Sequence, residues 1–274
     1  MPSDPSPDPV KARQRLAGSV IVVIGGTTGL GLSGARAMVG EGARVVVVGR
    51  NEKNAALAEQ ALGKAGAALV GDATVAETAE LAIALAGHRF GGFHGLYHVA
   101  GGSGRSHGDG PLDSITDEGW DFTLQLNLTS VFYSNRAAVR AFLLQGKGGV
   151  VLNMGSVLGF APAPEFFSTH AYAAAKAAII GLTRSCASRY APDGIRFNVL
   201  CPALVATPMS RRAQLDQGIG EYMRTKQPLG GGGIGDSEDL DAAVVYFVSE
   251  DSRCATGQVL SVDGGWAVSE GQYR

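Results

Sequence analysis

The stretch VIVVIGGTTGLGLSGARAMVG, residues 20–40, decides the fold. It begins with a short β-branched run without charge, continues through glycines, and ends in an Ala, Gly and Met segment with helical spacing. A strand, a glycine turn and a helix in this order predict the opening unit of a parallel α/β sheet. Glycines at this turn would let a pyrophosphate reach the helix N-terminus, where free N–H groups and the helix dipole favour an anion. An ordinary turn between a strand and a helix is the alternative.

The same alternation continues along the chain. Further strands are predicted at residues 44–48, 67–70, 95–100, 149–154, 196–201 and 258–262. Helices are predicted at residues 31–40, 52–63, 74–86, 117–144, 171–190 and 239–249. Fully apolar strands between helices indicate a parallel sheet that is buried on both faces. We therefore predict an α/β fold: one Rossmann-type doubly wound sheet of about seven strands over residues 16–274, with ligands at the carboxyl ends of the strands.

Composition narrows the class of protein. The net charge of -2 leaves no large basic field for nucleic-acid binding. No apolar run reaches the roughly 20 residues of a membrane helix. The three cysteines fit neither a disulfide framework nor a metal motif, and they predict buried thiols in a reducing compartment. Residues 1–15 alternate Pro with Ser and Asp and are expected to be a flexible tail. We expect a cytoplasmic protein with a small-molecule partner and neither nucleic acid nor membrane as a partner.

A tyrosine and a lysine supply the candidate chemistry. Tyr172 and Lys176 are four residues apart in a predicted helix, so their side chains share one face. Ser156 follows the predicted strand 149–154, and Asn127 lies in the predicted helix 117–144. The alternatives are an amphipathic surface pair, a cap at a strand end and a polar group inside a helix. Four such residues in this order favour a shared site.

With these residues the chain resembles the classical short-chain dehydrogenase/reductase family over residues 16–268. The resemblance also rests on the glycine turn, Asp72, Ala100-Gly101, Pro202-Ala203 with Thr207, Gly257-Gln258 and Asp263-Gly264-Gly265. Pro228-Leu229-Gly230 and the C-terminal segment are similar to the 3-oxoacyl-acyl-carrier-protein reductase branch, although this similarity is generic. The resemblance implies an NAD(P)(H)-dependent oxidoreductase that transfers a hydride between nicotinamide and a carbonyl or CH–OH group. A cofactor-binding sensor or scaffold with little turnover is the alternative.

The resemblance also implies a role for each residue. Tyr172 would be the general acid or base, and Lys176 would lower its pKa and hold the nicotinamide ribose. Ser156 would stabilise charge on the substrate oxygen, and Asn127 would hold a water. The implied cofactor contacts are Gly25, Thr27, Thr28, Gly29, Leu30, Gly31, Arg50, Asn51, Asp72, Ala73, Ala100, Gly101, Tyr172, Lys176, Pro202, Ala203, Val205 and Thr207.

The end of the second strand bears on the choice of cofactor. An NAD site usually places an acid here on the ribose 2′-hydroxyl, but this chain has Gly49-Arg50. Gly49 leaves space, and Arg50 supplies a planar cation that suits a 2′-phosphate. NADP(H) is therefore favoured, and NAD(H) stays open because Arg50 could be a solvated charge.

Three departures from the family pattern stand out. The family usually has Thr at position 24, Asn-Asn-Ala-Gly after the fourth strand and Pro-Gly after the sixth, where this chain has Ile24, His98-Val99 and Ala203. The first and fourth strands are neighbours in the doubly wound order, so a polar contact between Thr and Asn would be replaced by apolar groups on both sides. Replacing both partners of a hydrogen bond is nearly neutral for stability, and we therefore expect Ile24 to pack near Val99. Ala203 would restrict the backbone near the nicotinamide. His94 and His98 lie in or beside a strand, where their spacing does not converge on one ion, so no metal is expected.

The substrate and the assembly are set by other segments. Residues 102–112, 158–170 and the mobile region 205–235 would shape the substrate pocket. Arg211, Arg212 and Arg224 could attract an anionic substrate or could form a solvated charged face. By resemblance we expect a homotetramer, or a dimer, that forms through the helices of Asn127 and Tyr172 and the C-terminal strand.

Overall fold

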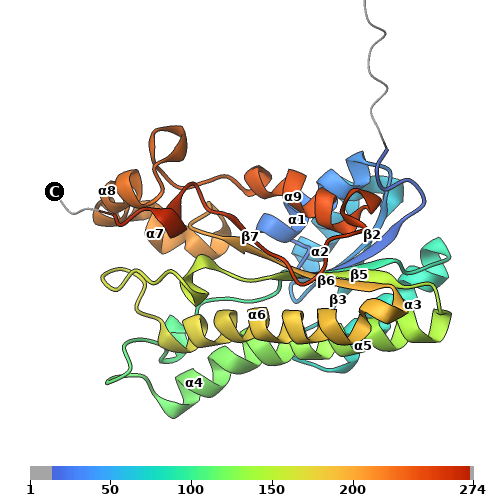
Figure 1. Ribbon diagram of the computed structural model, residues 1–274, viewed down its shortest axis with the longest axis horizontal. Coiled ribbons are helices and arrows are strands. Elements are labelled where there is room, and N and C mark those ends of the chain that lie inside the picture. Colours follow the sequence, from blue (N-terminus) through green and yellow to red (C-terminus); the bar gives the residue numbers. More distant parts are fainter. Residues whose placement is uncertain (1–13, 272–274) are drawn as a thin grey trace, which may run out of the picture.

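One parallel sheet organises the chain, and its strands lie in the order β3-β2-β1-β4-β5-β6-β7 (Figure 1). The computed structural model describes residues 14–271. Its strands are β1 Val20–Ile24, β2 Arg44–Gly49, β3 Gly66–Val70, β4 Gly95–His98, β5 Gly149–Met154, β6 Ile195–Pro202 and β7 Val259–Val262. The predicted doubly wound α/β fold is confirmed.

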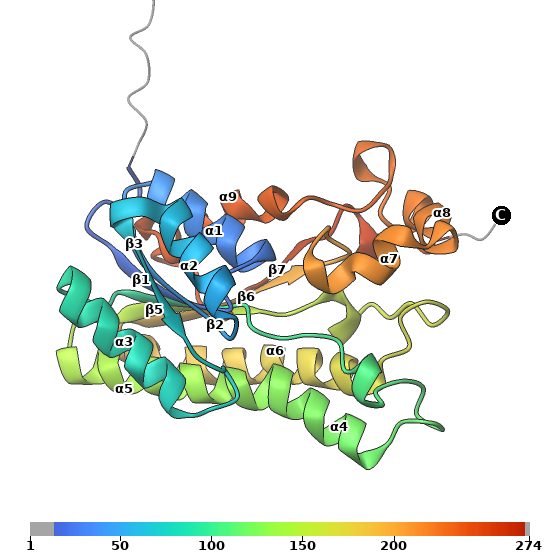
Figure 2. The same ribbon diagram turned by 180° about the vertical axis from the view of Figure 1, so that it is seen from behind.

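Helices cover both faces of this sheet. They are α1 Gly29–Gly40, α2 Glu52–Leu62, α3 Glu77–Phe90, α4 Asp117–Leu124, α5 Ser130–Gln145, α6 His170–Tyr190, α7 Arg211–Leu215, α8 Gln217–Lys226 and α9 Asp241–Val248. Figures 1 and 2 show α3, α4, α5 and α6 on one side of the sheet and α1, α2 and α9 on the other. The right-handed crossovers of parallel strands produce this two-sided cover.

The alternation of side chains along β1 divides the apolar core in two. Ile21 and Val23 belong to the cluster under α1, α2 and α9, whereas Val20, Val22 and Ile24 belong to the cluster under α3 and α5. All five are at most 2% exposed. A strand that is buried on both faces must be apolar at every position, which is why this sequence reads as an unbroken apolar run.

The predicted helix 117–144 is wrong as a single element. The structure has α4, a π-helical turn at Gln125–Thr129, and then α5. A π-helical turn has i→i+5 hydrogen bonds over only a few residues, which is too short a change to stand out in the periodicity of a long segment. The turn contains Asn127, and such turns often occur at functional sites.

Two helices occur in the segment that the sequence left without regular structure. α7 and α8 lie inside residues 205–235 and pack over a small apolar cluster that includes Ile219, Met223 and Trp266. Trp266 also donates from Nε1 to the carbonyl of Ala161. Contacts with residues far away in the chain therefore stabilise these short helices. The spacing of apolar residues within the segment does not reveal such contacts.

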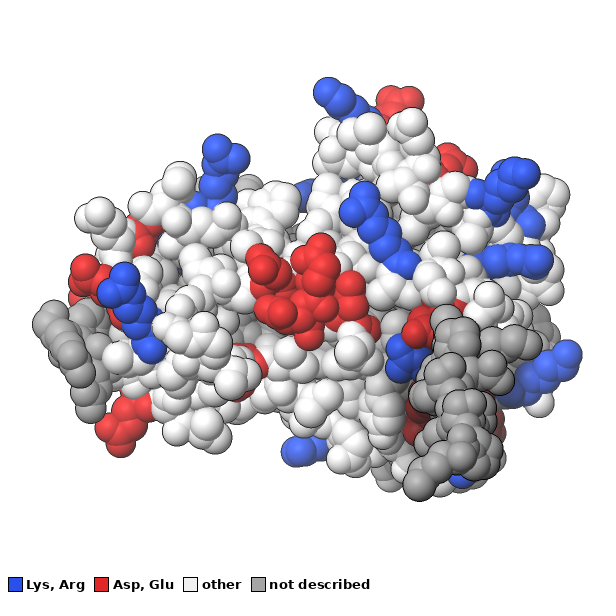
Figure 3. Space-filling view, turned by 90° about the horizontal axis from the view of Figure 1, so that it is seen from above, with Lys and Arg blue, Asp and Glu red and all other residues white. Residues whose placement is uncertain are grey.

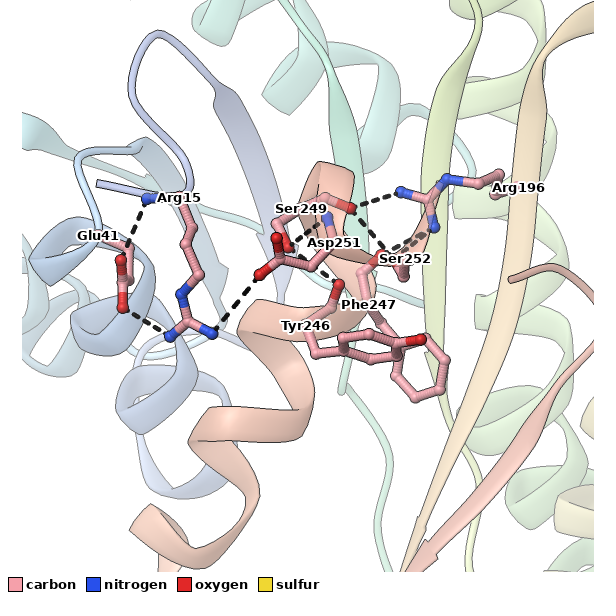
Figure 4. A network of polar contacts seen from close by, with 8 residues as sticks. All are labelled: Arg15, Glu41, Arg196, Tyr246, Phe247, Ser249, Asp251 and Ser252. Carbon is pink, nitrogen blue, oxygen red and sulfur yellow. Dashed lines mark hydrogen bonds and ion pairs between the residues drawn. The ribbon is translucent and has the colours of Figure 1, made fainter. Parts of the chain in front are cut away.

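Residues 14 and 15 are the only part of the expected N-terminal tail that the structure describes. Residues 1–13 of the expected tail lie outside the described residues. Arg15 is bound to the fold: its side chain contacts Glu41 at 2.6 Å, and its main-chain N–H donates to the same carboxylate (Figure 4). The Arg15 guanidinium also lies 3.9 Å from Asp251.

Arg196 of β6 anchors the end of α9 in the same network (Figure 4). Its guanidinium donates to the carbonyl oxygens of Phe247 and Ser249 and to the hydroxyl of Ser252. The carbonyl groups in the last turn of a helix lack intrahelical partners, and a cation there is favourable. This contact ties α9 to the sheet.

Surface charge, the apolar character of the helices and the exposure of the cysteines bear on the expectations from composition. Figure 3 shows acidic side chains gathered in the middle of one face, with separate Lys and Arg side chains around them and no continuous basic field. None of the helices in residues 14–271 combines the length and the apolar character needed to cross a bilayer. Cys201 is buried and Cys186 is half-buried, but Cys254 is exposed, so the expectation of buried thiols is wrong for Cys254.

Ile24 packs differently from the expectation. Its partner in the β1–β4 register is His98, and the main-chain N–H of Val99 donates to the Ile24 carbonyl. The Ile24 side chain belongs to the core under α3 and α5, whereas Val99 packs against the other core. The expected packing of Ile24 near Val99 is wrong because successive side chains of a strand point to opposite faces.

His98 is a fully buried polar side chain at the end of β4. Its Nδ1 lies 2.6 Å from the Ser134 hydroxyl, and its Nε2 lies 3.1 Å from the carbonyl oxygen of Ala100. Burial, and secondarily the charge of Lys176, lowers the pKa of His98 to about 3. The imidazole is therefore neutral in the folded protein at physiological pH, while it would take up a proton near pH 6.5 after unfolding.

This difference predicts a pH-dependent stability. Because the unfolded chain binds the proton first, the free energy of unfolding should fall as the pH drops below about 6.5, by about 2 kcal/mol between pH 7 and 5. His98→Asn should remove this contribution, whereas His88→Asn on the exposed face of α3 should retain it. Urea unfolding over a pH series measures both. An identical pH dependence in wild type and His98→Asn would contradict the prediction.

Candidate active site

A cavity of about 290 Å³ lies at the carboxyl ends of β1, β2, β3 and β4. The predicted cofactor residues that line it are Gly25, Thr27, Thr28, Gly29, Leu30, Arg50, Asn51, Asp72, Ala73, Ala100, Gly101 and Thr207. The sequence missed further lining residues: Val48, Asn54, Gly71, Leu126, Pro208 and Met209. Most of the missed residues are close neighbours of predicted ones, so the strand-end positions were the signal that could have found them.

The glycine turn brings backbone close to backbone. A Cβ on Gly31 would lie 2.1 Å from the carbonyl oxygen of Gly25, and a Cβ on Gly25 would lie 2.5 Å from the nitrogen of Ala100. Gly25 also has a φ of 87°, which favours glycine. Gly31 itself does not line the cavity, so its absent side chain serves the packing of the turn.

The N-terminus of α1 faces this turn without a side-chain partner. Thr28 at the N-cap makes no side-chain capping hydrogen bond, and the first turn of α1 contains no acidic residue. The first N–H groups of a helix need an acceptor, and with the helix dipole they favour an anion. The turn, the cavity and the helix end together fit a dinucleotide diphosphate.

The end of β2 leaves room only for a small residue. A Cβ on Gly49 would lie 2.1 Å from the hydroxyl oxygen of Thr27. Arg50 is exposed and lines the cavity, and among residues 14–271 it has no ion-pair partner. Asn51 also lines the cavity, while its side chain caps α2 by accepting from the N–H of Asn54. The Arg50 guanidinium is therefore available to a ligand.

A second cavity, of about 100 Å³, continues from the first. Both are lined by Leu30, Gly101 and Thr207, so they form one trough along the carboxyl ends of the strands. The second cavity is lined by six further predicted residues: Ser156, Tyr172, Lys176, Pro202, Ala203 and Val205, whereas Asn127 lines neither cavity. A long ligand could therefore extend from Arg50 at one end to Tyr172 at the other.

Tyr172 and Ser156 face each other in this second cavity. Burial raises the pKa of Tyr172 to about 12, although a hydrogen bond with the Ser156 side chain acts in the opposite direction. Ser156 also accepts from the N–H of Leu158, so it caps the turn after β5 as well. Desolvation of the phenol has the largest effect on this pKa, and it acts opposite to the lowering expected from Lys176.

Lys176 is a buried ammonium group beneath the trough. Its side chain is 3% exposed, and its Nζ donates to the carbonyl of Met154 at 2.8 Å. Its Nζ lies 5.5 Å from the centre of the Tyr172 ring. Within residues 14–271 no carboxylate lies within ion-pair distance of it, and burial lowers its pKa to about 8. An ammonium with spare donors suits the hydroxyl groups of a ribose.

Asn127 fixes the loop beside Lys176. Its side-chain amide donates to the carbonyls of Gly102 and Thr123, and its Oδ1 accepts from the N–H of Gly102. A Cβ on Gly101 would lie 2.7 Å from Asn127 Oδ1 and 3.5 Å from Lys176 Nζ. Asn127 and Lys176 therefore converge across Gly101, where a side chain would not fit.

Asp109 is a residue of the site that the sequence did not reveal. It is almost completely buried, and its carboxylate accepts from the main-chain N–H groups of Ala171 and Tyr172. A carboxylate at the first turn of a helix satisfies free N–H groups and favours the dipole. Asp109 thereby holds the start of α6 and the backbone of Tyr172. Nothing local could predict this contact, because 62 residues separate Asp109 from Ala171.

A third cavity, of about 130 Å³, adjoins the second one at Tyr172. Ser156 and Tyr172 line both this cavity and the second one. Most of its remaining wall comes from the three segments expected to shape the substrate pocket, with Ser103, Leu158 and Met209 as examples, and Val157, Ala203 and Leu204 complete it. Arg212 lines it, but Arg211 and Arg224 do not. Neither His94 nor His98 lines this cavity. His94 Nδ1 accepts a hydrogen bond from the main-chain N–H of Val20.

Known proteins are similar to this chain in sequence and in fold. The family model described as enoyl-(acyl carrier protein) reductase matches residues 25–267. A 3-oxoacyl-[acyl-carrier-protein] reductase of Haemophilus influenzae is 32% identical over 93% of this chain and 100% of its own length. The 2-(S)-hydroxypropyl-CoM dehydrogenase 3 of Xanthobacter autotrophicus is 33% identical over 92% of this chain and 97% of its own.

The similarity extends to solved structures. A short-chain type dehydrogenase/reductase from Mycobacterium ulcerans superposes with a TM-score of 0.85 and 26% identity, covering 93% of this chain and 92% of the other. The chain therefore belongs to the short-chain dehydrogenase/reductase family, and it is an oxidoreductase that transfers a hydride between a nicotinamide cofactor, NAD(P)(H), and a carbonyl or CH–OH group.

Proposed function

We propose that Tyr172 exchanges the proton of the reaction and that Ser156, Lys176 and Asn127 support it. The observation that carries this proposal is the position of the Tyr172 and Ser156 pair, which lines both the trough and the third cavity. A carbonyl oxygen at this junction would accept hydrogen bonds from both hydroxyl groups. The nicotinamide, when bound, supplies or accepts the hydride at the carbonyl carbon.

The raised pKa of Tyr172 suits the direction of reduction. Because burial raises this pKa to about 12, the phenol holds its proton at neutral pH and can donate it to the substrate oxygen. The nearby Lys176 ammonium would then stabilise the phenolate that remains. Ser156 would stabilise charge on the substrate oxygen as the proton moves.

Asn127 would contribute mainly through position. Its amide holds the Gly102 loop against the π-helical turn, and its Oδ1 faces Lys176 across Gly101. Any water that it holds for Lys176 would use the remaining acceptor position of Oδ1 or the main-chain carbonyl. This arrangement would connect the buried ammonium to solvent.

The Tyr172 proposal predicts different pH profiles for reduction and for oxidation. With saturating cofactor, kcat/KM for ketone reduction should stay flat across neutral pH, whereas alcohol oxidation should rise by about tenfold per pH unit, because oxidation needs the rare phenolate. Tyr172→Phe should lower kcat in both directions by on the order of 10²-fold or more. Tyr190→Phe, further along α6, is the matched control and should keep activity. Retention of wild-type kcat by Tyr172→Phe would refute the role.

We propose NADP(H) as the preferred cofactor. The support comes from the exposed Arg50 at the cavity, which has no carboxylate partner among residues 14–271, and from the small space at Gly49. An aspartate at position 49 would collide with Thr27 unless Thr27 moved. Arg50 could instead bind a 2′-phosphate with paired hydrogen bonds.

Cofactor titration of two variants tests this preference. Arg50→Gln should weaken NADP(H) binding by about tenfold or more, with little change for NAD(H), because a charged hydrogen bond contributes roughly 1.5–3 kcal/mol. Lys53→Gln removes an exposed positive charge nearby that does not line the cavity, and it should leave both affinities unchanged. Tighter binding of NAD(H) than of NADP(H) to the wild type would overturn the preference.

We further propose a cytoplasmic homotetramer. Free thiols support a reducing compartment, and exposed apolar side chains on α5 and β7 support subunit contacts. The apolar residues are Phe132, Leu143, Leu144 and Leu260. Light scattering during gel filtration should give the mass of a tetramer, or of a dimer if only one surface is used. A monomer at micromolar concentration would contradict the assembly.

A further inference from the structure

Two arginines lie at the rim of the third cavity, next to Tyr172 and Ser156. Arg105 comes from the loop after β4, and Arg212 comes from α7. Both donate from a terminal nitrogen to the same acceptor, the carbonyl oxygen of Phe166, at 2.9 and 3.2 Å. Two chain segments distant in sequence therefore bring two guanidinium groups together where a substrate would enter.

The positive charge of this pair is not balanced by acids in the cavity wall. No Asp or Glu lines the third cavity, and within residues 14–271 neither guanidinium lies within ion-pair distance of a carboxylate. Asp109 is nearby, but both of its oxygens accept from the start of α6. Burial and then the charge of Arg212 lower the pKa of Arg105, whereas Asp109 raises it. The two like charges thus repel each other, and an anion would relieve that repulsion.

The remaining donors have the geometry of an acid-binding site. A guanidinium carries five N–H donors in a plane, and the contact to Phe166 engages one nitrogen of each arginine. Guanidinium groups bind carboxylates with paired hydrogen bonds. The cavity volume of about 130 Å³ is well below the 300–1,000 Å³ of sites for drug-sized ligands, which favours a short substrate.

We propose that this enzyme acts on short keto acids and hydroxy acids, with Arg105 and Arg212 binding the substrate carboxylate. The inference rests on the proposed role of Tyr172 at the same cavity. In reduction, the carbonyl carbon gains the hydride of NAD(P)H and the carbonyl oxygen gains the Tyr172 proton, so the products are a hydroxy acid and NAD(P)⁺. The carboxylate stays unchanged and serves to orient the carbonyl between Tyr172 and Ser156.

Pairs of acids and methyl esters test the inference, because an ester keeps the carbonyl but removes the charge. The probes are pyruvate, acetoacetate and levulinate with their methyl esters, which also vary the spacing between carbonyl and carboxylate. For at least one spacing, the wild type should favour the acid in kcat/KM by about tenfold or more. Arg105→Gln and Arg212→Gln should each raise KM for that acid by about tenfold with little change in kcat, and should leave the ester unaffected.

Arg211→Gln is the matched control, because Arg211 is an exposed neighbour on the same helix that does not line the cavity. It should retain the preference for the acid. A purely structural role for the pair, as a clamp on Phe166, would lower the melting temperature and impair acid and ester alike. Equal ratios of acid to ester in wild type and both variants would overturn the proposal.

Binding without turnover separates this inference from the proposed catalytic role. Saturation-transfer NMR with the NADP⁺-loaded protein, using whichever of pyruvate, acetoacetate and levulinate has the highest kcat/KM and its methyl ester, should show binding of the acid, and the double variant should lose it. If Tyr172→Phe keeps wild-type turnover but the arginine variants lose the acid, only the catalytic role fails. If the wild type binds acid and ester equally, the carboxylate site fails whatever Tyr172 does.

Discussion

The parallel register of the central strands is the constraint on which the site depends. Ile24, His98, Asn153 and Val199 lie side by side across β1, β4, β5 and β6. β1, β4 and β5 therefore end at nearly the same level, β6 continues to Pro202, and the loops that follow open at one edge of the sheet. The glycine turn, the Gly101 loop and Ser156 all belong to these loops. A slip of one residue in any strand would turn its apolar side chains to the wrong core and would shift the loop that follows.

Burial decides the electrostatics at that edge. It raises the pKa of Tyr172 and lowers the pKa of Lys176, so desolvation favours the neutral form of each group. The ammonium nevertheless has the Met154 carbonyl as an acceptor, and the phenol has Ser156. Asp109 adds a carboxylate that is used entirely by the start of α6. The negative charge near Tyr172 is thus committed to the backbone, while the positive charges of Lys176, Arg105 and Arg212 remain open to ligands.

The sequence predicted the features that depend on neighbouring residues and missed those that depend on contacts between distant ones. The strand at residues 149–154 agrees with the structure at both ends, because β-branched apolar residues between glycines leave little choice. The π-helical turn around Asn127 was missed, since it is too short to stand out in the periodicity of the helical segment. The packing of Ile24 against Val99 was wrong because adjacent strands place these side chains in different cores.

The sequence alone determined the α/β fold, the glycine turn and the Tyr172 and Lys176 pair, because strand runs, turns and residues one helical turn apart are local patterns. Only the tertiary structure decided that Asp109 holds the start of α6 and that Arg105 meets Arg212 at Phe166. These contacts join segments separated by about 45 residues or more. Which distant loops meet depends on the strand order and the crossovers, so the pair of cations at the substrate cavity exists only once the sheet is complete.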